Sequence, residues 1–177
     1  ALQVPISHVG MSGWTTLQML EHQHSGENID VCGETHPGLG RLLRDGRFTT
    51  VLLMAGTNDL GVASAEQIFA NLQALHAMCH AAGASTVALS IPQSKATSVG
   101  PRFARERREG VNALLSEYAK AHPAKVTFVA MDAAVPWAAT SPHWERDGLH
   151  MSKLGYAAFA RALAPKLLEA GAVRTGE

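Results

Sequence analysis

A largely apolar run from Phe48 to Ala55 stops abruptly on the polar turn Gly56-Thr57-Asn58-Asp59. A run this short, rich in β-branched and aliphatic residues, predicts a strand that is buried on both faces of a parallel sheet. Ligands of open α/β sheets bind just beyond the carboxyl ends of the strands. We therefore expect the chemistry of this protein to lie at this turn.

Downstream of this run, apolar strands alternate with helices. Buried strands are predicted from Thr86 to Ile91 and from Lys125 to Met131. The clearest helix opens with the capping pair Ser64 and Gln67 and is closed by Gly83. This alternation predicts one α/β domain in which a parallel sheet is wrapped in helices.

The other segments have weaker patterns. Leu2 to Val9 alternates weakly and contains Pro5, which favours a strand near a sheet edge. Gly10 to Thr16 predicts a tight loop. The remaining expected segments are a short helix from Thr16 to His22, an extended piece from Ile29 to Cys32, a helical turn from Leu39 to Leu43, a flexible stretch from Gln93 to Gly100, a helix beginning near Pro101, a loop from Ala133 to Arg146, and a last helix capped by Ser152.

Composition narrows the class of protein. At 177 residues and 46% hydrophobic content, the chain is long enough for one domain, residues 1–177, with a core of its own. Fifteen basic and 15 acidic side chains cancel, so nothing indicates a nucleic-acid partner, and no apolar stretch is long enough to span a membrane. Two cysteines, Cys32 and Cys79, leave both a single disulfide and the cellular compartment open.

Two polar turns carry groups that are suited to catalysis. Asp147 and His150 are three residues apart, so the carboxylate can hold the Nδ1 proton of the imidazole while Nε2 accepts a proton from a nucleophile. The side-chain amide of Asn58 can donate to an oxyanion, and Gly13 lets a substrate oxygen approach its backbone N–H. Each feature alone more often reflects ordinary turn chemistry. Their combination is what indicates a site.

Three blocks in this order resemble those of the SGNH (GDSL-type) hydrolases. They are Ser12-Gly13-Trp14-Thr15-Thr16, Gly56-Thr57-Asn58-Asp59 and Asp147-Gly148-Leu149-His150. The resemblance covers nearly the whole chain and matches the second, third and fifth blocks of the family. It implies a three-layer α/β/α sandwich with a flavodoxin-like parallel sheet.

The resemblance also implies an activity, that of a serine esterase acting on a small-molecule ester. In such an enzyme Asp147 would orient His150, His150 would act as general base and then acid, and Gly13 and Asn58 would complete the oxyanion hole. No metal or organic cofactor is implied. Candidate residues for the substrate pocket are Trp14, Thr57 and Trp144, although Trp144 could equally pack its loop.

The first block of the family, a Gly-Asp-Ser that supplies the nucleophile, does not occur in these residues. Ser12 is the available substitute, but Gly10-Met-Ser12-Gly-Trp14 does not meet the nucleophile-elbow pattern. A second alternative takes Gly10-Met-Ser12 as a degenerate first block and Cys32-Gly33-Glu34-Thr35 as the second. That alignment leaves little room for the helix between the blocks, so we expect the nucleophilic serine to lie outside the chain.

The missing block would also remove the first central strand of the resembled sheet. Its neighbours, the strands expected at Leu2 to Val9 and Val51 to Ala55, would then leave unpaired backbone groups, each costing about 1–3 kcal/mol if buried. We therefore expect an upstream strand and helix of roughly 40 residues. The unit could be a separate N-terminal fragment, a removed segment, or a strand from a second copy.

Two other functions stay open at this stage. A non-catalytic domain could keep the sheet and loops and bind a ligand without turnover. An acyltransferase could use the same scaffold if a dry site lets an alcohol outcompete water. The particular ester or acyl group does not follow from the fold.

Overall fold

A three-stranded parallel sheet forms the centre of the protein, whose computed structural model describes residues 6–46, 48–169 and 171. The strand order is β3-β4-β5, so β4 is central and β3 has a partner on one side within the described residues. The bounds of the strands are Thr50–Leu53 for β3, Ser85–Leu89 for β4 and Val126–Val129 for β5. Strands β3 and β5 lie within the segments that the apolar runs predict, and β4 begins one residue before its predicted start at Thr86.

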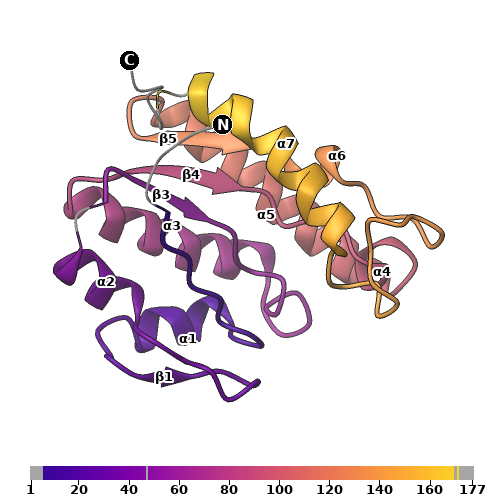
Figure 1. Ribbon diagram of the computed structural model, residues 1–177, viewed down its shortest axis with the longest axis horizontal. Coiled ribbons are helices and arrows are strands. Elements are labelled where there is room, and N and C mark those ends of the chain that lie inside the picture. Colours follow the sequence, from indigo (N-terminus) through magenta and orange to yellow (C-terminus); the bar gives the residue numbers. More distant parts are fainter. Residues whose placement is uncertain (1–5, 47, 170, 172–177) are drawn as a thin grey trace.

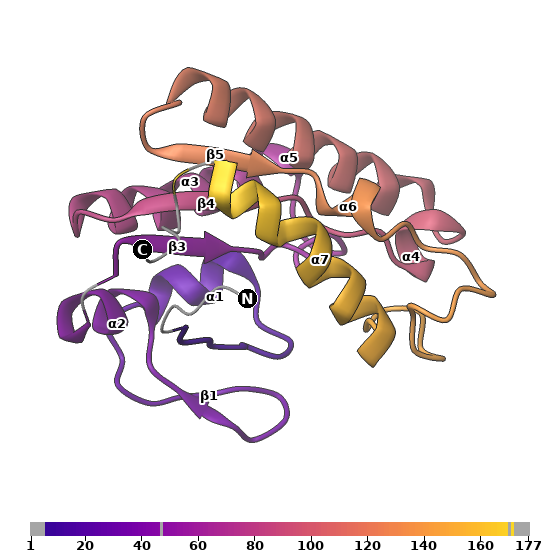
Figure 2. The ribbon, with the colours of Figure 1, turned by 45° about the horizontal axis from the view of Figure 1, so that its top comes forward.

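Three long helices cover the two faces of this sheet (Figure 1). Helices α3 (Ala65–Ala81) and α5 (Arg102–Ala121) lie on one face, and α7 (Lys153–Glu169) crosses the other face, as Figure 2 shows. Helix α3 begins at the predicted capping box, in which Ser64 and Gln67 bond reciprocally. The predicted three-layer α/β/α arrangement is confirmed.

Six shorter elements connect these layers. They are α1 (Thr16–Glu21), β1 (Asn28–Ile29), β2 (Thr35–His36), α2 (Leu39–Asp45), α4 (Lys95–Ser98) and α6 (Met131–Ala134). The prediction of an unbroken flexible stretch from Gln93 to Gly100 is wrong, because Ser94 and Thr97 form a capping box that starts α4. Helix α6 is also unpredicted, and it takes up Met131, the predicted end of the third strand, and the start of the loop expected from Ala133.

Two apolar clusters hold the layers together. The larger cluster joins α3 and α5 to the sheet through the fully buried Ile68 and Val111, and Leu53 of β3 packs against it. The smaller cluster lies on the opposite face, where Leu163 of α7 and Val87 of β4 belong to the same group of buried side chains. Each face of the central strand β4 is therefore covered by helices.

The expectation that the strand within Phe48 to Ala55, which is β3, is buried on both faces is wrong. Leu52 and Met54 are 41% and 44% exposed, because β3 is an edge strand here and the helix on their face covers the other strands. The expected strand from Leu2 to Val9 is likewise not found. Residues 6–9 belong to no strand, and residues 2–5 lie outside the described part of the chain.

Two open questions about the chain are answered by the structure. No described helix combines the length and the hydropathy that crossing a bilayer requires. Cys32 is exposed and Cys79 is buried, and both are free thiols, so they do not form a disulfide.

The free energy of unfolding should fall in mildly acidic solution because of His76. Burial, helped by the nearby His80, lowers the pKa of His76 to about 4, while its Nδ1 bonds Thr86 Oγ1 at 2.8 Å. Below its ordinary pKa the imidazole takes up a proton in the unfolded chain but not in the folded one. This contribution to stability is therefore complete above that pKa and is lost as the pH falls towards 4.

Urea denaturation at pH 7 and pH 5 measures the effect. We expect the unfolding free energy to drop by about 2 kcal/mol more in the native sequence than in the His76→Gln variant, which cannot titrate. Equal drops in the two proteins would show that His76 does not bind its proton differently in the two states.

Candidate active site

The Asp147 carboxylate holds the imidazole of His150. Asp147 Oδ2 lies 2.7 Å from His150 Nδ1, and Oδ1 accepts the backbone N–H groups of Leu149 at 2.8 Å and His150 at 3.0 Å. This geometry assigns the ring proton to Nδ1 and leaves Nε2 with a lone pair that can accept a proton. Because the two side chains are 51% and 65% exposed, Nε2 is within reach of a substrate.

The same contacts keep Asp147 ionised. The hydrogen bond from the His150 side chain and then those from the backbone of Leu149 and His150 lower the pKa of Asp147 to about 2. A carboxylate that stays negative at neutral pH stabilises the imidazolium that forms when Nε2 takes a proton. The pair is therefore equipped for general base and general acid steps.

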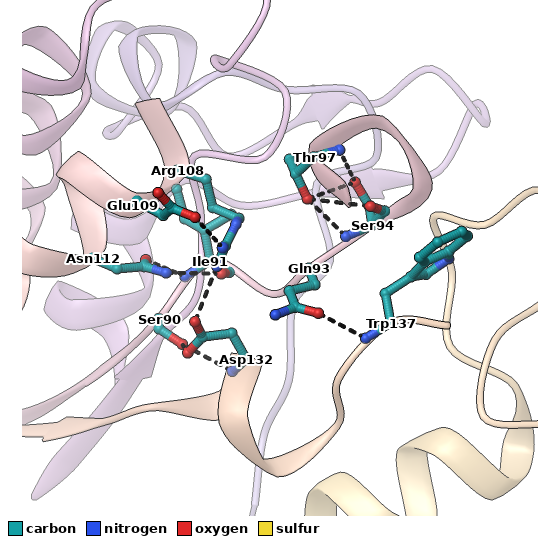
Figure 3. Close-up of polar contacts among 10 residues, drawn as sticks. All are labelled: Ser90, Ile91, Gln93, Ser94, Thr97, Arg108, Glu109, Asn112, Asp132 and Trp137. Carbon is teal, nitrogen blue, oxygen red and sulfur yellow. Dashed lines mark hydrogen bonds and ion pairs between the residues drawn. The ribbon is translucent and has the colours of Figure 1, made fainter. Parts of the chain in front are cut away.

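The turn that carries His150 is tied to the segment after β4. The backbone N–H of Lys95 donates to Gly148 O at 2.7 Å. Nearby, Gln93 Oε1 accepts the backbone N–H of Trp137 at 2.9 Å (Figure 3). These contacts fix the long loop after β5 to the carboxyl end of the central strand.

That strand end is itself held by a buried polar cluster, drawn in Figure 3. Asn112 of α5 bonds both backbone groups of Ile91, at 2.7 and 3.1 Å. Ser90 Oγ donates to Asp132 Oδ1 at 2.8 Å, and Arg108 pairs with Asp132 Oδ2 at 3.0 Å. The cluster ties the ends of β4 and β5 to α5 and so positions the loops above them.

The turn that carries Asn58 contacts the loop that carries Gly13. Asn58 Nδ2 donates to Trp14 O at 2.9 Å, which joins the turn after β3 to the Gly13 loop. Since an amide carries two N–H groups, one is left to donate to a substrate oxygen. Gly13 has a φ of 76°, and an added Cβ would lie 2.6 Å from Val31 Cγ1, so only glycine fits there.

The two loops are locked together by Asp59. Its carboxylate is 1% exposed and accepts the Thr16 backbone N–H at 3.0 Å and the Thr16 hydroxyl at 2.5 Å. Asn71 of α3 donates to the same hydroxyl oxygen at 3.0 Å. Asp59 therefore anchors the start of α1, and with it the Gly13 loop, to the end of β3.

A second carboxylate, that of Asp30, holds the Gly13 loop, and the sequence analysis did not identify it. Asp30 is 7% exposed and accepts backbone N–H groups from Ser12, Cys32 and Glu34. Burial raises the pKa of Asp30, but the backbone donors outweigh it and the net shift is downward. The sequence signal available was an aspartate three residues before Gly33, which is typical of a side-chain-stabilised turn.

The three predicted pocket residues occupy different environments. Trp14 and Thr57 are half-buried in the loops that carry Gly13 and Asn58. Trp144 is 8% exposed, packs with Val135 and Met151, and donates from Nε1 to Pro136 O at 3.1 Å. Of the two roles open for Trp144, this position supports packing under the His150 loop.

The edge of the sheet thus carries two sets of groups. One set is the acid–base pair Asp147 and His150, and the other is the donor pair Gly13 and Asn58. None of the hydrogen bonds between described residues joins the two sets directly.

In the part of the chain that the structure describes, no group of three His, Cys, Asp or Glu residues could hold a metal ion. The groups present support proton transfer and hydrogen bonding to an oxyanion.

Comparison with known protein families gives one match. The GDSL-like Lipase/Acylhydrolase family matches residues 1–158 of the chain. No curated protein matches this chain.

Solved structures with a similar fold include several esterases. A GDSL-like lipase from Bacteroides thetaiotaomicron superposes with a TM-score of 0.67 and 20% identity, over 92% of this chain and 75% of that chain. The psychrotrophic esterase EstA from a Pseudoalteromonas species, solved with monoethylphosphonate as inhibitor, gives 0.61 and 21%, over 89% and 73%. A carbohydrate esterase family 3 protein from Talaromyces cellulolyticus gives 0.66 and 16%, over 92% and 71%.

Replacing Asp59 by alanine should destabilise the protein strongly. The Asp59→Ala change leaves the N–H and the hydroxyl of Thr16 without their buried acceptor, so we expect the free energy of unfolding to fall by about 2–4 kcal/mol. Glu27→Ala, which removes an exposed carboxylate just before β1, should change it by less than about 0.5 kcal/mol. Similar urea midpoints for the two variants would contradict the anchoring role of Asp59.

Proposed function

Because the chain belongs to the GDSL-like lipase/acylhydrolase family, we propose that it is a serine-type carboxylic-ester hydrolase. The observation that carries this proposal is the 2.7 Å contact between Asp147 Oδ2 and His150 Nδ1, which leaves Nε2 as a base on an exposed turn. The substrate class is a small-molecule ester. Neither a metal nor an organic cofactor is part of the proposed mechanism.

In the proposed reaction His150 moves one proton in each half of the cycle. Its Nε2 takes the proton of a serine hydroxyl as the oxygen attacks the ester carbonyl, and returns it to the alcohol oxygen when the C–O bond breaks. Water then attacks the acyl-serine and gives its proton to Nε2, which passes that proton to the serine oxygen as the bond between the acyl carbon and that oxygen breaks and the carboxylic acid leaves. Asp147 stays ionised throughout and stabilises the imidazolium.

The oxyanion of each tetrahedral intermediate would be held by Gly13 and Asn58. The absence of a side chain at Gly13 allows close approach to its backbone N–H, and the Asn58 amide has a second N–H beyond the one given to Trp14 O. Loss of one such donor typically costs about 10²–10³ in kcat. The bond between Asn58 and Trp14 supports a hole that is rigid before substrate binds.

We place the nucleophilic serine outside these 177 residues. Ser12 lies next to Gly13, but its backbone N–H and C=O are bound by Asp30 and Val31 in the turn below the loop. A serine from another segment would have to reach both Gly13 and His150. The phosphonate inhibitor of the Pseudoalteromonas esterase is compatible with a serine nucleophile, since activated serines react with such compounds.

Exposure of the site favours hydrolysis over acyl transfer. An acyltransferase needs a site in which an alcohol outcompetes water, and His150 is 65% exposed. The alternative of a binding domain without turnover gives no reason for the ionised Asp147 to hold the Nδ1 proton of His150. Product ratios in the presence of an added alcohol separate hydrolase from transferase.

His150→Ala tests the proposal in an active preparation of the protein. We expect hydrolysis of p-nitrophenyl acetate to fall by about 10³-fold or more, because the variant lacks the base that activates the serine. His143→Ala, on the same loop, should keep the rate, and both variants should keep the urea midpoint of the native protein. Unchanged ester cleavage by His150→Ala would refute the assigned mechanism.

A further inference from the structure

The loop of Gly13 is a tight turn whose central peptide has two alternative orientations. Trp14 N–H donates to Met11 O at 3.1 Å, which closes a four-residue turn. Gly13 has a φ of 76°, and no described residue other than glycine has a positive φ. A negative φ at Ser12 followed by a positive φ at Gly13 defines a type II turn. A type I turn differs from it chiefly by a rotation of the Ser12–Gly13 peptide through about half a turn.

This peptide carries the proposed oxyanion donor. Because a trans peptide directs its C=O and N–H to opposite sides, the direction of Ser12 O determines that of Gly13 N–H. Ser12 O accepts the backbone N–H of Val31 at 3.2 Å, so it points at the turn between β1 and β2. Gly13 N–H therefore points away from that turn. Among the described residues none accepts a hydrogen bond from it, so this N–H is available to a substrate oxygen.

Asp30 holds Ser12 from its other end. Oδ2 of Asp30 accepts Ser12 N–H at 3.1 Å, while Oδ1 accepts the N–H groups of Cys32 at 2.8 Å and Glu34 at 3.0 Å. The bonds to Oδ1 shape the turn that presents Val31 N–H to Ser12 O. Figures 1 and 2 both show this turn beside the loop that precedes α1. With its N–H and its C=O both bound by the hairpin, Ser12 cannot rotate its carbonyl without breaking a bond.

The rotated peptide would oppose the reaction. It would turn Ser12 O to the side where Gly13 N–H now points, and a carbonyl oxygen at that position repels an oxyanion. Glycine itself does not select between the two orientations, because it adopts φ of either sign. The contacts of Asn58 and Asp59 hold Trp14 and Thr16, which lie outside this peptide. The choice of orientation therefore depends on the hairpin.

We propose that Asp30 is a positioning residue for ester hydrolysis, which keeps the Ser12–Gly13 peptide in the orientation that presents Gly13 N–H to the oxyanion. Asp30 acts through Ser12 and not on the substrate. Its effect on catalysis rests on the proposed function, whereas its effect on the orientation of the peptide does not. An ionised carboxylate is suited to this role, because both of its oxygens accept N–H groups.

Asp30→Asn separates the two tasks of this side chain. Its one carbonyl oxygen can keep the bonds from Cys32 and Glu34, and its NH₂ group then faces Ser12 N–H, which is also a donor. The variant therefore loses the bond to Ser12 and retains the turn. Glu34→Gln is the matched control, because it makes the same change of charge at an exposed side chain of the same turn.

Kinetics and hydrogen exchange of an active preparation of the protein test the proposal. We expect Asp30→Asn to lower kcat for p-nitrophenyl acetate by about 10- to 100-fold and to change KM by less than about threefold, because the donor acts on the oxyanion and not on the bound ester. The amide of Val31 should be protected in the native protein and exchange at least about tenfold faster in Asp30→Asn. The amide of Cys32 should keep its rate, and Glu34→Gln should match the native protein throughout.

Three results would overturn the proposal. They are an unchanged kcat in Asp30→Asn, an unchanged exchange rate of Val31, and loss of folding, seen in the urea midpoint, in both Asp30→Asn and Asp30→Ser. The serine side chain can still accept from Cys32 but is too short to reach Ser12, so two unfolded variants would show that Asp30 serves stability alone.

His150→Ala, measured alongside, separates this inference from the proposed function. If His150→Ala loses activity while Asp30→Asn keeps it, the proposed function stands and the positioning role fails. If His150→Ala keeps its activity, the proposed function fails and the role of Asp30 in hydrolysis fails with it. The exchange rate of Val31 then still decides whether Asp30 orients the peptide.

Discussion

The buried contact between Asp59 and Thr16 determines how the two loops of the candidate site are held together. One carboxylate, 43 residues away along the chain, accepts both the backbone N–H and the hydroxyl of Thr16. This contact fixes the loop of Gly13 against the turn of Asn58, so the two proposed oxyanion donors are held on adjoining loops. Without it, the bonds that the described residues give to this loop and to Thr16 would be those from the β1–β2 hairpin, the one from Asn58 and the one from Asn71.

The acid–base pair depends on a separate set of supports. Lys95 binds Gly148, Gln93 binds Trp137, and the ion pair of Arg108 with Asp132 ties the strand ends to α5. The sheet therefore works as a rigid base for the candidate groups, of which Asn58 follows β3 and the pair Asp147 and His150 follows β5. This arrangement is typical of α/β enzymes, in which function lies on loops and stability in the sheet.

Local signals in the sequence predicted most of the fold and the nature of the candidate site. The apolar run before Asn58, the capping pair of Ser64, and the spacing of Asp147 and His150 each act within a few residues, so a single sequence contains them. Contacts such as Lys95 with Gly148 join distant loops, which periodicity cannot predict. The exposure of Leu52 also could not be predicted, because an apolar strand has the same pattern whether or not its neighbour is present.

In the proposed mechanism, His150 and Asp147 activate a serine from outside these 177 residues. Intact mass spectrometry of the purified native protein after exposure to a fluorophosphonate tests it most directly, because the reagent modifies only an activated serine. The account predicts one adduct, located on a serine upstream of these residues. An adduct on Ser12 would contradict that placement, and no adduct on any species would contradict the serine mechanism itself.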